Sequence, residues 1–335
     1  MQEFFRAKAE LKGSEIGAKL LFLSCNSAPE SPLISKIPSC FSRKPFLDIL
    51  MLADLIYGPF LALALRLRGV TVVHFTTTHF SNIPLAVIFR LLGGRVMSTV
   101  HRFDLDSYDT FRRLLLTLYE KLIFLISGKI IILSDDARVP AAKKVVIPMA
   151  GYKQQVNEAK KTASYYMFFG RIDDYKGLED ILRLARELPH LKFVVAGNGY
   201  SPFISDLRSL ENVTVINRFI ADSELEDLFS GARLVLLPYK SISQSAVQIL
   251  SYSYATPVVC YDVGNLKEFI IDGITGCLVP DGDYLAFRKA IESFDMNNLC
   301  EMSGNCISYF NTRFSDEILY DQYKEFYSNT LFRSN

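Results

Sequence analysis

Short apolar runs and amphipathic stretches alternate along the chain in two successive series. In the first half, β-rich runs occur at 19–24, 70–75, 95–101, 129–134 and 145–148, and helical patterns occur at 45–68, 82–92 and 108–126. In the second half, the expected strands are 165–169, 192–196, 213–216, 234–238 and 257–261, and the expected helices are 178–187, 202–210, 222–230, 244–255, 283–294 and 315–327. Continuous apolar strands separated by helices predict parallel sheets that are covered on both faces.

This double series predicts two Rossmann-like, doubly wound α/β domains, which suits a chain of 335 residues. The polar run 153–163 has no apolar period and is interpreted as the linker between a first domain at 1–152 and a second at 164–312. Residues 313–335 are expected to form a C-terminal helix that could pack back on the first domain. Two such domains are expected to bind ligands in a cleft at the carboxyl ends of their strands.

Composition excludes a disordered chain, because half of the residues are apolar. The net charge of +1 is unevenly distributed: residues 1–150 hold 19 Lys and Arg against 12 Asp and Glu, and residues 151–335 hold 18 against 24. A basic first half would suit an anionic membrane surface or a phosphorylated acceptor, although ordinary surface variation is the alternative.

The six cysteines show no C-x-x-C spacing, so reduced thiols of a cytosolic protein are expected rather than disulfides or a zinc site. The first residues lack the apolar core of a signal peptide. The apolar stretch 46–67 is interrupted by Asp48, Asp54 and a Gly-Pro pair, which favours a buried or interfacial helix over a membrane span. The stretch 111–126 could lie on a membrane, but core packing more often causes such a pattern.

The segment 168–177, FFGRIDDYKG, combines a strand end, a glycine, two cations and a helix start. Gly170 interrupts the apolar strand, and a helical pattern begins at Leu178. Exposed amides and the helix dipole favour phosphate there, and Arg171 and Lys176 can close over it. The layout predicts a site for a doubly charged group such as a nucleoside diphosphate. A surface turn with two solvated cations would give the same pattern.

Three further segments follow strands and could carry chemistry. Gly197-Asn198-Gly199 would let a ligand approach the backbone closely, although such a pair is often just a turn. Gln244-Ser245-Ala246-Val247 falls at a predicted helix start, where free amides could bind an anion or the serine could simply cap the helix. His101, with Arg102 and Asp104, follows the strand RVMSTV, at the sheet edge where α/β proteins bind ligands.

Several common catalytic and nucleotide-binding patterns are absent from the sequence. There is no nucleophile elbow, no H-E-x-x-H, no Walker loop and no G-x-G-x-x-G after the first strand. The loop after that strand, which contains Asn26 and Ser27, has no glycine, and this argues against a nicotinamide dinucleotide site.

Taken in order, these segments make the second half resemble the donor domain of retaining glycosyltransferases of family four, whose two-domain fold is called GT-B. The resemblance rests on FFGRIDDYKGLEDIL, FVVAGNG, LVLLPY and the stretch from SAVQILSYSYATPVV to GCLVPDGD. It covers residues 164–295 closely and the first half by architecture only.

The resemblance implies a role for each matching position. Arg171 and Lys176 would hold the donor's diphosphate and stabilise its charge as the sugar–phosphate bond breaks, and His101 would lie near the reacting sugar. The other donor-binding positions would be Gly170, Gly197, Asn198, Gly199, Asn217, Arg218, Phe219, Gln244, Ser245, Ala246 and Val247. The acceptor-side candidates are Asn26, Ser27, Arg102 and Asp104.

One departure from the family's pattern concerns a pair of glutamates that most members carry before a stretch like ATPVV. The corresponding positions here are Ile242 and Leu250, which are not acidic. The chain instead resembles a branch with Q-S-G-V after a Pro-Tyr pair, with Ala246 in place of the glycine. The usual carboxylate contact to the sugar or ribose is therefore not expected.

The function that this reading predicts is a metal-independent, retaining glycosyltransferase. It would move a sugar from a UDP-, GDP- or other nucleotide sugar to a glycan or lipid-linked acceptor in bacterial surface polysaccharide or glycolipid synthesis. The nucleotide sugar is a co-substrate; no cofactor and no nucleic-acid partner is expected. The expected location is cytoplasmic, with peripheral contact to the inner face of the plasma membrane. The alternatives are a non-catalytic GT-B binding or regulatory protein and a sugar-nucleotide epimerase, which would need an acid/base set that is not apparent.

Overall fold

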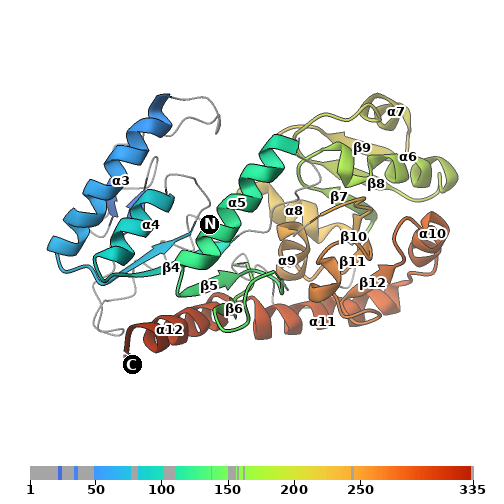
Figure 1. Cartoon of the computed structure of the whole chain (residues 1–335). Helices are drawn as coiled ribbons and strands as arrows, with labels where there is room; N and C mark the ends of the chain where they lie inside the picture. Colours follow the sequence, from blue (N-terminus) through green and yellow to red (C-terminus); the bar gives the residue numbers. More distant parts are fainter. Residues whose placement is uncertain are drawn as a thin grey trace. The chain divides into compact units, whose positions relative to one another are not determined.

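The computed structural model describes residues 22–24, 34–36, 49–76, 82–100, 110–136, 138–149, 156, 158–160, 163–242 and 245–332. The chain divides into two compact units. The first comprises Met1–Pro148 with Tyr320–Asn335, and the second comprises Met149–Leu319 (Figure 1). Each unit is an α/β domain built on a parallel sheet, as the alternation of strands and helices predicts.

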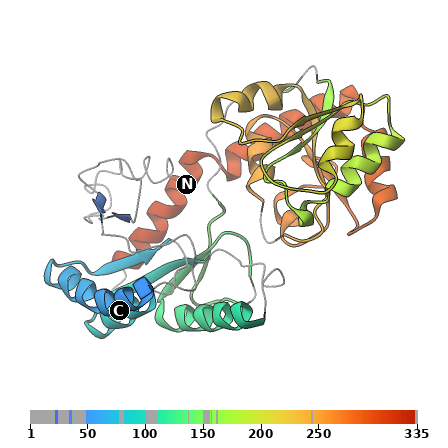
Figure 2. The same cartoon turned by 90° about the horizontal axis from the view of Figure 1, so that it is seen from above.

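The first unit is built on a four-stranded parallel sheet in the order β3-β4-β5-β6. Its strands are Val72–Phe75, Arg95–Val100, Lys129–Ile132 and Lys144–Val146. A separate parallel pair joins β1, Phe22–Ser24, to β2, Ile34–Lys36. Helix α4, Asn82–Leu91, packs on β4 and is flanked by α3, Ile49–Leu67, and α5, Thr110–Ile126 (Figure 2).

The C-terminal helix α12, Asp316–Phe332, packs on strands of this first sheet. His74 of β3 lies 2.7 Å from the Tyr327 hydroxyl and 2.9 Å from Thr99 Oγ1. Arg95 at the start of β4 donates to the Thr330 carbonyl at 2.5 Å. These contacts explain why the last residues of the chain belong to the first unit.

The second unit has a six-stranded, all-parallel sheet in the order β12-β11-β10-β7-β8-β9. Its strands are, in chain order, Tyr165–Phe169, Phe193–Ala196, Val213–Ile216, Ala232–Leu237, Val258–Tyr261 and Gly276–Val279. Every residue of β8 and β11, and nearly every residue of β10, is buried. Both faces of the sheet are therefore covered, which explains why these strands are continuously apolar.

The order of these strands fixes where a ligand is expected. From β7 the chain moves outward to β8 and β9, then returns to the other side of β7 with β10 and continues to β11 and β12. The topological switch point therefore lies between β7 and β10. Open parallel sheets bind ligands at this point, outside the carboxyl ends of the two strands.

The described residues of the second unit form six α-helices between its first strand and Arg313. They are α6, Leu178–Glu187; α7, Ile204–Ser209; α8, Leu225–Ser230; α9, Ala246–Ser253; α10, Tyr284–Glu292; and α11, Met296–Arg313. Asp283 and Asp295 cap α10 and α11, since their carboxylates accept from the Ala286 and Asn298 amides at 2.9 and 2.8 Å. Lys160 lies near the start of the second unit. Its ammonium donates to the carbonyls of Phe229 and Ala232 and to Thr256 Oγ1, which anchors this segment to the core of the unit.

The sequence reading missed two elements of the second unit. Helix α11 buries only a thin line of apolar side chains, Leu299, Met302, Cys306 and Phe310, and asparagines and a glycine interrupt its pattern. Strand β12 is a four-residue edge strand that begins with a glycine. The predicted helix 222–230 divides into a short 3₁₀ turn, Asp222–Glu224, and α8.

The described cysteines are free thiols. Cys260 and Cys306 are buried, Cys277 is partly buried and Cys300 is exposed. Burial raises the pKa of the Cys260 thiol, so it stays protonated at neutral pH. No helix among the described residues is both long enough and apolar enough to span a bilayer.

Candidate functional site

The loops that follow β7 and β8 are joined to each other at the switch point. The Gly170 amide donates to the Ala196 carbonyl at 3.0 Å, and the Ile172 amide donates to the Asn198 carbonyl at 2.9 Å. Gly197 has a φ of 151°, and a Cβ at this position would lie 1.8 Å from the Gly170 oxygen. Only glycine fits there, so the second loop can follow the first loop closely.

The loop after β7 also contacts the loop after β10. Gly177 adopts the left-handed conformation, with a φ of 72°, and a Cβ there would lie 1.8 Å from the Pro238 oxygen. The Lys240 amide donates to the Tyr175 carbonyl at 2.8 Å. These two contacts place the Asp174–Lys176 turn directly against the end of β10.

Lys176 is buried in this contact, with only 6% of its surface exposed. Its ammonium lies 3.6 Å from the centre of the Tyr239 ring, which is itself fully buried, and 5.2 Å from the centre of the Tyr175 ring. Burial, and secondly the positive charge of Arg171, lower the pKa of Lys176 to about 7. A buried cation of this kind would gain from a neighbouring anion, because the anion would restore the charged form.

Arg171 reaches the same region from the end of β7, but its side chain is 69% exposed. It pairs with Asp173 at 2.9 Å and donates to the Tyr175 hydroxyl at 3.3 Å. Exposed ion pairs contribute little to stability, about 0–1 kcal/mol. A phosphate could therefore replace Asp173 as the partner of the Arg171 guanidinium with little loss of stability.

The start of α9 completes this group of loops. Ser245 occupies the N-cap position without capping the helix, and the Val247 side chain lies beside Gly170, 3.1 Å from where a Cβ would be. Ser245 Oγ and the Tyr239 hydroxyl are both buried and lie near each other, but neither has a close hydrogen-bond partner among the residues that the structure describes. Free helix amides and two such hydroxyls favour a ligand rather than a capping serine.

The loop after β9 is less clearly part of the site. Arg218 pairs with both oxygens of Glu224, at 2.8 and 2.5 Å, and the pKa of that carboxyl falls to about 2 because of this hydrogen bonding. Arg218 therefore fixes its own loop. Phe219 is 75% exposed, and the side-chain oxygen of Asn217 is buried without a hydrogen bond to the described residues.

Part of the predicted site lies outside the described residues. These positions are Asn26, Ser27, His101, Arg102, Asp104 and Gln244. The structure thus brings together Gly170, Arg171, Lys176 and Gly197 with Ser245, Ala246 and Val247, all in the second unit. The acceptor-side residues stay predictions.

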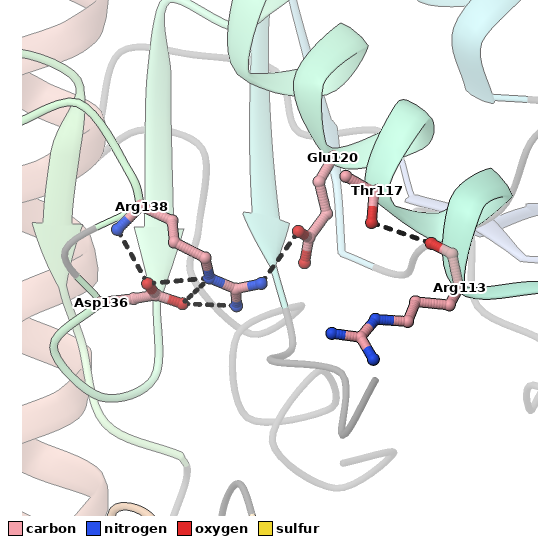
Figure 3. Close-up of polar contacts among 5 residues, drawn as sticks. All are labelled: Arg113, Thr117, Glu120, Asp136 and Arg138. Carbon is pink, nitrogen blue, oxygen red and sulfur yellow. Dashed lines mark hydrogen bonds and ion pairs between the residues drawn. The ribbon is translucent and has the colours of Figure 1, made fainter. Parts of the chain in front are cut away.

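Sequence reasoning missed two features that the fold makes visible. Tyr239 was noticed only as part of a Pro-Tyr pair, although its ring lies under the Lys176 ammonium. In the first unit, Arg138 binds both oxygens of Asp136 and also Glu120 at 3.0 Å, just after β5 (Figure 3). Glu120 is a buried carboxylate on α5, which a sequence pattern gives no reason to expect. Within the described ranges, no three His, Cys, Asp or Glu side chains are grouped to hold a metal ion.

Comparison with known sequences identifies the class of the second unit. Residues 163–294 match the family described as Glycosyl transferases group 1. An uncharacterized 41.2 kDa protein in the cps region of Klebsiella pneumoniae is 25% identical over 175 residues, which are 52% of this chain and 48% of that protein. D-inositol 3-phosphate glycosyltransferase from Mycobacterium sp. (strain KMS) is 32% identical over 138 residues, 38% of this chain and 31% of the enzyme. The chain thus spans about half or less of the length of these relatives.

Solved structures match over nearly the whole fold. Sucrose-phosphate synthase from Thermosynechococcus elongatus has a TM-score of 0.71 at 19% identity, covering 91% of this chain and 86% of that one. HepE from Anabaena in complex with UDP has a TM-score of 0.68 at 14% identity, covering 88% of this chain and 86% of that one. At such identities the likeness establishes the fold, which is that of the two-domain GT-B glycosyltransferases. The match to the Glycosyl transferases group 1 family lies within the second unit, at residues 163–294.

Proposed function

We propose that this protein is a retaining, metal-independent glycosyltransferase that takes its sugar from a nucleoside-diphosphate donor. The observation that carries the proposal is the position of Lys176 and Arg171 at the switch point between β7 and β10, in the loop whose Gly170 lies beside the start of α9. Two cations and a helix start at this point suit a diphosphate. HepE, which shares the fold, was crystallised with UDP and with UDP-glucose, so UDP-sugars are the first donors to test.

The proposed chemistry is electrostatic. When the sugar–phosphate bond breaks, negative charge builds on the leaving diphosphate, and Arg171 and protonated Lys176 would stabilise it without a metal ion. Retention of configuration is proposed from the family resemblance, with the acceptor attacking from the face that the diphosphate leaves. His101 is proposed to lie near the reacting sugar, and Asn26, Ser27, Arg102 and Asp104 near the acceptor.

The donor would be held differently from most of the family. Ile242 and Leu250 stand where the paired glutamates are usual, and Leu250 is buried at 3% exposure. We assign the chain to the branch with Q-S-(G/A)-V at this point. In this branch, Ser245, the amides of Ala246 and Val247, and the Gly197–Gly199 loop would make contacts to the donor that a carboxylate otherwise provides.

The acceptor is proposed to be a glycan or a lipid-linked saccharide of a bacterial surface polysaccharide or glycolipid. The cps-region relative supports this class of acceptor. The proposed setting is the cytoplasm, with the reaction at the inner face of the plasma membrane.

The test is a turnover assay with a panel of radiolabelled UDP-, GDP-, ADP- and dTDP-sugars and membrane lipid extracts as acceptors. The variants are Arg171→Ala and Lys176→Gln, and the matched control is Arg186→Ala, another exposed arginine that pairs with a carboxylate, Asp206. We expect transfer or slow donor hydrolysis by the wild type and by the control. Each site variant should lose on the order of 100-fold or more in rate.

The same assay separates the two alternative functions. A non-catalytic GT-B binding or regulatory protein would bind a nucleotide sugar without any turnover. An epimerase would convert the donor into its epimer and transfer nothing, which chromatography of the recovered nucleotide sugar would reveal. Equal rates for the wild type and Arg171→Ala would refute the assignment of the site.

A further inference from the structure

The outer face of α3 is apolar and exposed. Ile56, Phe60, Leu63 and Leu67 recur at helical spacing and fall within one narrow stripe. Phe60 and Leu67 expose 67% and 80% of their surface, whereas Leu65 faces the core at 3%. A helix that is apolar on both its core side and its outer side needs a second apolar partner.

Helix α5 carries a second stripe of the same kind. Leu114, Leu118 and Leu125 recur at helical spacing and are 65%, 51% and 71% exposed. Lys121 lies in the same stripe and is exposed as well. The opposite side of this helix is buried, since Tyr119 and Ile123 contribute to the core.

The two stripes belong to neighbouring helices of one layer. Helix α4 packs against both α3 and α5 (Figures 1 and 2), and Arg90 joins it to α5 by donating to the Ile126 carbonyl at 2.9 Å. At the end of α4, Leu91 is 76% exposed, and its neighbour Leu92 accepts from Arg66 of α3. We use the name helix surface for the exposed apolar side chains of α3 and α5.

The charged side chains that the structure describes as exposed on or next to α3 and α5 are basic. Residues 55–100 contain four arginines and neither an acidic residue nor a lysine. On α5, Glu120 is buried and bound to Arg138, whereas Arg113 and Lys121 are exposed. Arg68, just after α3, is also exposed. Exposed leucines beside lysine and arginine are typical of surfaces that bind anionic lipid.

We propose that the helix surface docks this protein on an anionic phospholipid bilayer. Helices α3 and α5 lie flat on it, with their exposed leucine, isoleucine and phenylalanine side chains entering between the headgroups and the arginines and lysines meeting lipid phosphates. The docking uses the first unit alone and does not depend on which sugar is transferred. A failed vesicle assay would therefore contradict the proposed membrane setting but would leave the proposed sugar transfer untouched.

Two other partners could cover the helix surface: a second copy of the chain, or the chain's own residues 1–48. Both match its positive charge less well than an anionic membrane does. A second copy would meet the same patch across a two-fold axis, so the exposed arginines and lysines that the structure describes would face their own kind. The chain's own residues 1–48 hold seven Lys and Arg against five Asp and Glu, so they too are basic. An anionic lipid surface supplies the opposite charge.

The test is flotation of the full chain with vesicles of phosphatidylcholine alone or of phosphatidylcholine with phosphatidylglycerol. Two variants each alter one stripe: Phe60→Ser with Leu67→Ser, and Leu118→Ser with Leu125→Ser. The matched control changes exposed apolar residues of the second unit, Tyr200→Ser with Leu285→Ser, which are 77% and 68% exposed. Thermal unfolding of each variant checks that it is folded.

We expect binding to the anionic vesicles only, weakened by salt. Each stripe variant should lose on the order of tenfold or more in affinity, and the control should match the wild type. Removing a charge with Arg68→Gln or Lys121→Gln should weaken binding roughly fivefold each. Absence of binding by the wild type, or unchanged binding by folded stripe variants, would overturn the proposal. So would a stable dimer, seen by sedimentation, that the stripe variants dissociate.

Discussion

Binding of a nucleoside diphosphate should draw a proton onto Lys176. Burial and the nearby Arg171 lower the pKa of this lysine to about 7, so at pH 8 about nine-tenths of it is neutral before the ligand arrives. A diphosphate beside the ammonium favours the charged form and raises that pKa again. The uptake that Lys176 contributes on binding should therefore be about 0.9 proton at pH 8, about half a proton at pH 7 and roughly 0.1 at pH 6.

Because the pKa of Lys176 is lowered in the free protein, the affinity for UDP should fall as the pH rises. Above the pKa of the free protein, each unit of pH makes the lysine about tenfold harder to charge, which corresponds to about 1.4 kcal/mol. The dissociation constant for UDP should therefore rise about tenfold per pH unit above pH 7, until the pKa of the complex is reached. The ligand's own terminal phosphate titrates near pH 6, so the protons counted at pH 8 are those of the protein.

Isothermal titration calorimetry of UDP in buffers of different ionisation enthalpy measures this uptake. Lys176→Arg keeps a charge that does not titrate, so its uptake at pH 8 should be close to zero. Lys160→Met is the matched control, because Lys160 is partly buried, also has a pKa lowered to about 7, and is bonded to core acceptors away from the proposed site. Tight binding by the wild type without proton uptake, or equal uptake by Lys176→Arg, would refute the reasoning.

The remaining predictions concern the residues around this lysine and the core of the second unit. Tyr239→Leu removes the ring beneath the ammonium, worth about 2 kcal/mol for a desolvated pair, so calorimetry should place the midpoint of proton uptake below pH 7. Gly273→Ala, with a φ of 73° and no neighbour within 4 Å, should cost about 1 kcal/mol in urea unfolding. Gly177→Ala, with nearly the same φ but a clash with a backbone oxygen, should cost several kcal/mol more; equal losses would contradict the close contact. The pKa of Lys160 is lower in the folded protein than in the unfolded chain. Its contribution to the free energy of unfolding should therefore increase with pH from about pH 7 upward, by at most about 1.4 kcal/mol per pH unit. Lys160→Met should flatten the pH dependence of unfolding in that range, and an unchanged slope would show that the lysine is charged in the core.

The fold could largely be predicted from hydrophobic pattern. Strands 165–169 and 213–216 and helix 178–187 have the predicted bounds. The first strand is apolar throughout because its centre is buried, the second is a mostly apolar edge strand, and α6 has one clearly apolar face. Helix α11 could not be predicted in this way, because it buries about one apolar side chain per turn and asparagines and a glycine interrupt the pattern. The apolar face of α3 was expected to be buried or interfacial, and the pattern alone could not tell which part of it stays exposed.

The candidate site was predicted in its residue types but not in its physical state. Spacing alone pointed to Arg171 and Lys176, and the strand order then places them at the switch point. Sequence could not reveal that Lys176 is buried, since lysine is among the residues least often found inside. That burial comes from Tyr239, which is 63 positions further along the chain and adjacent only because β10 pairs with β7. A contact between residues so far apart along the chain leaves no local pattern in the sequence from which it could be predicted.

The affinity of UDP for the wild type, Arg171→Ala and the control Arg186→Ala tests the central claim most directly. Losing a charge-assisted bond to the diphosphate, worth about 1.5–3 kcal/mol, should weaken binding to Arg171→Ala by about 10- to 100-fold. Arg186→Ala should bind as the wild type does. If Arg171→Ala bound UDP and every other nucleoside diphosphate as tightly as the wild type, the donor site would not lie between β7 and β10.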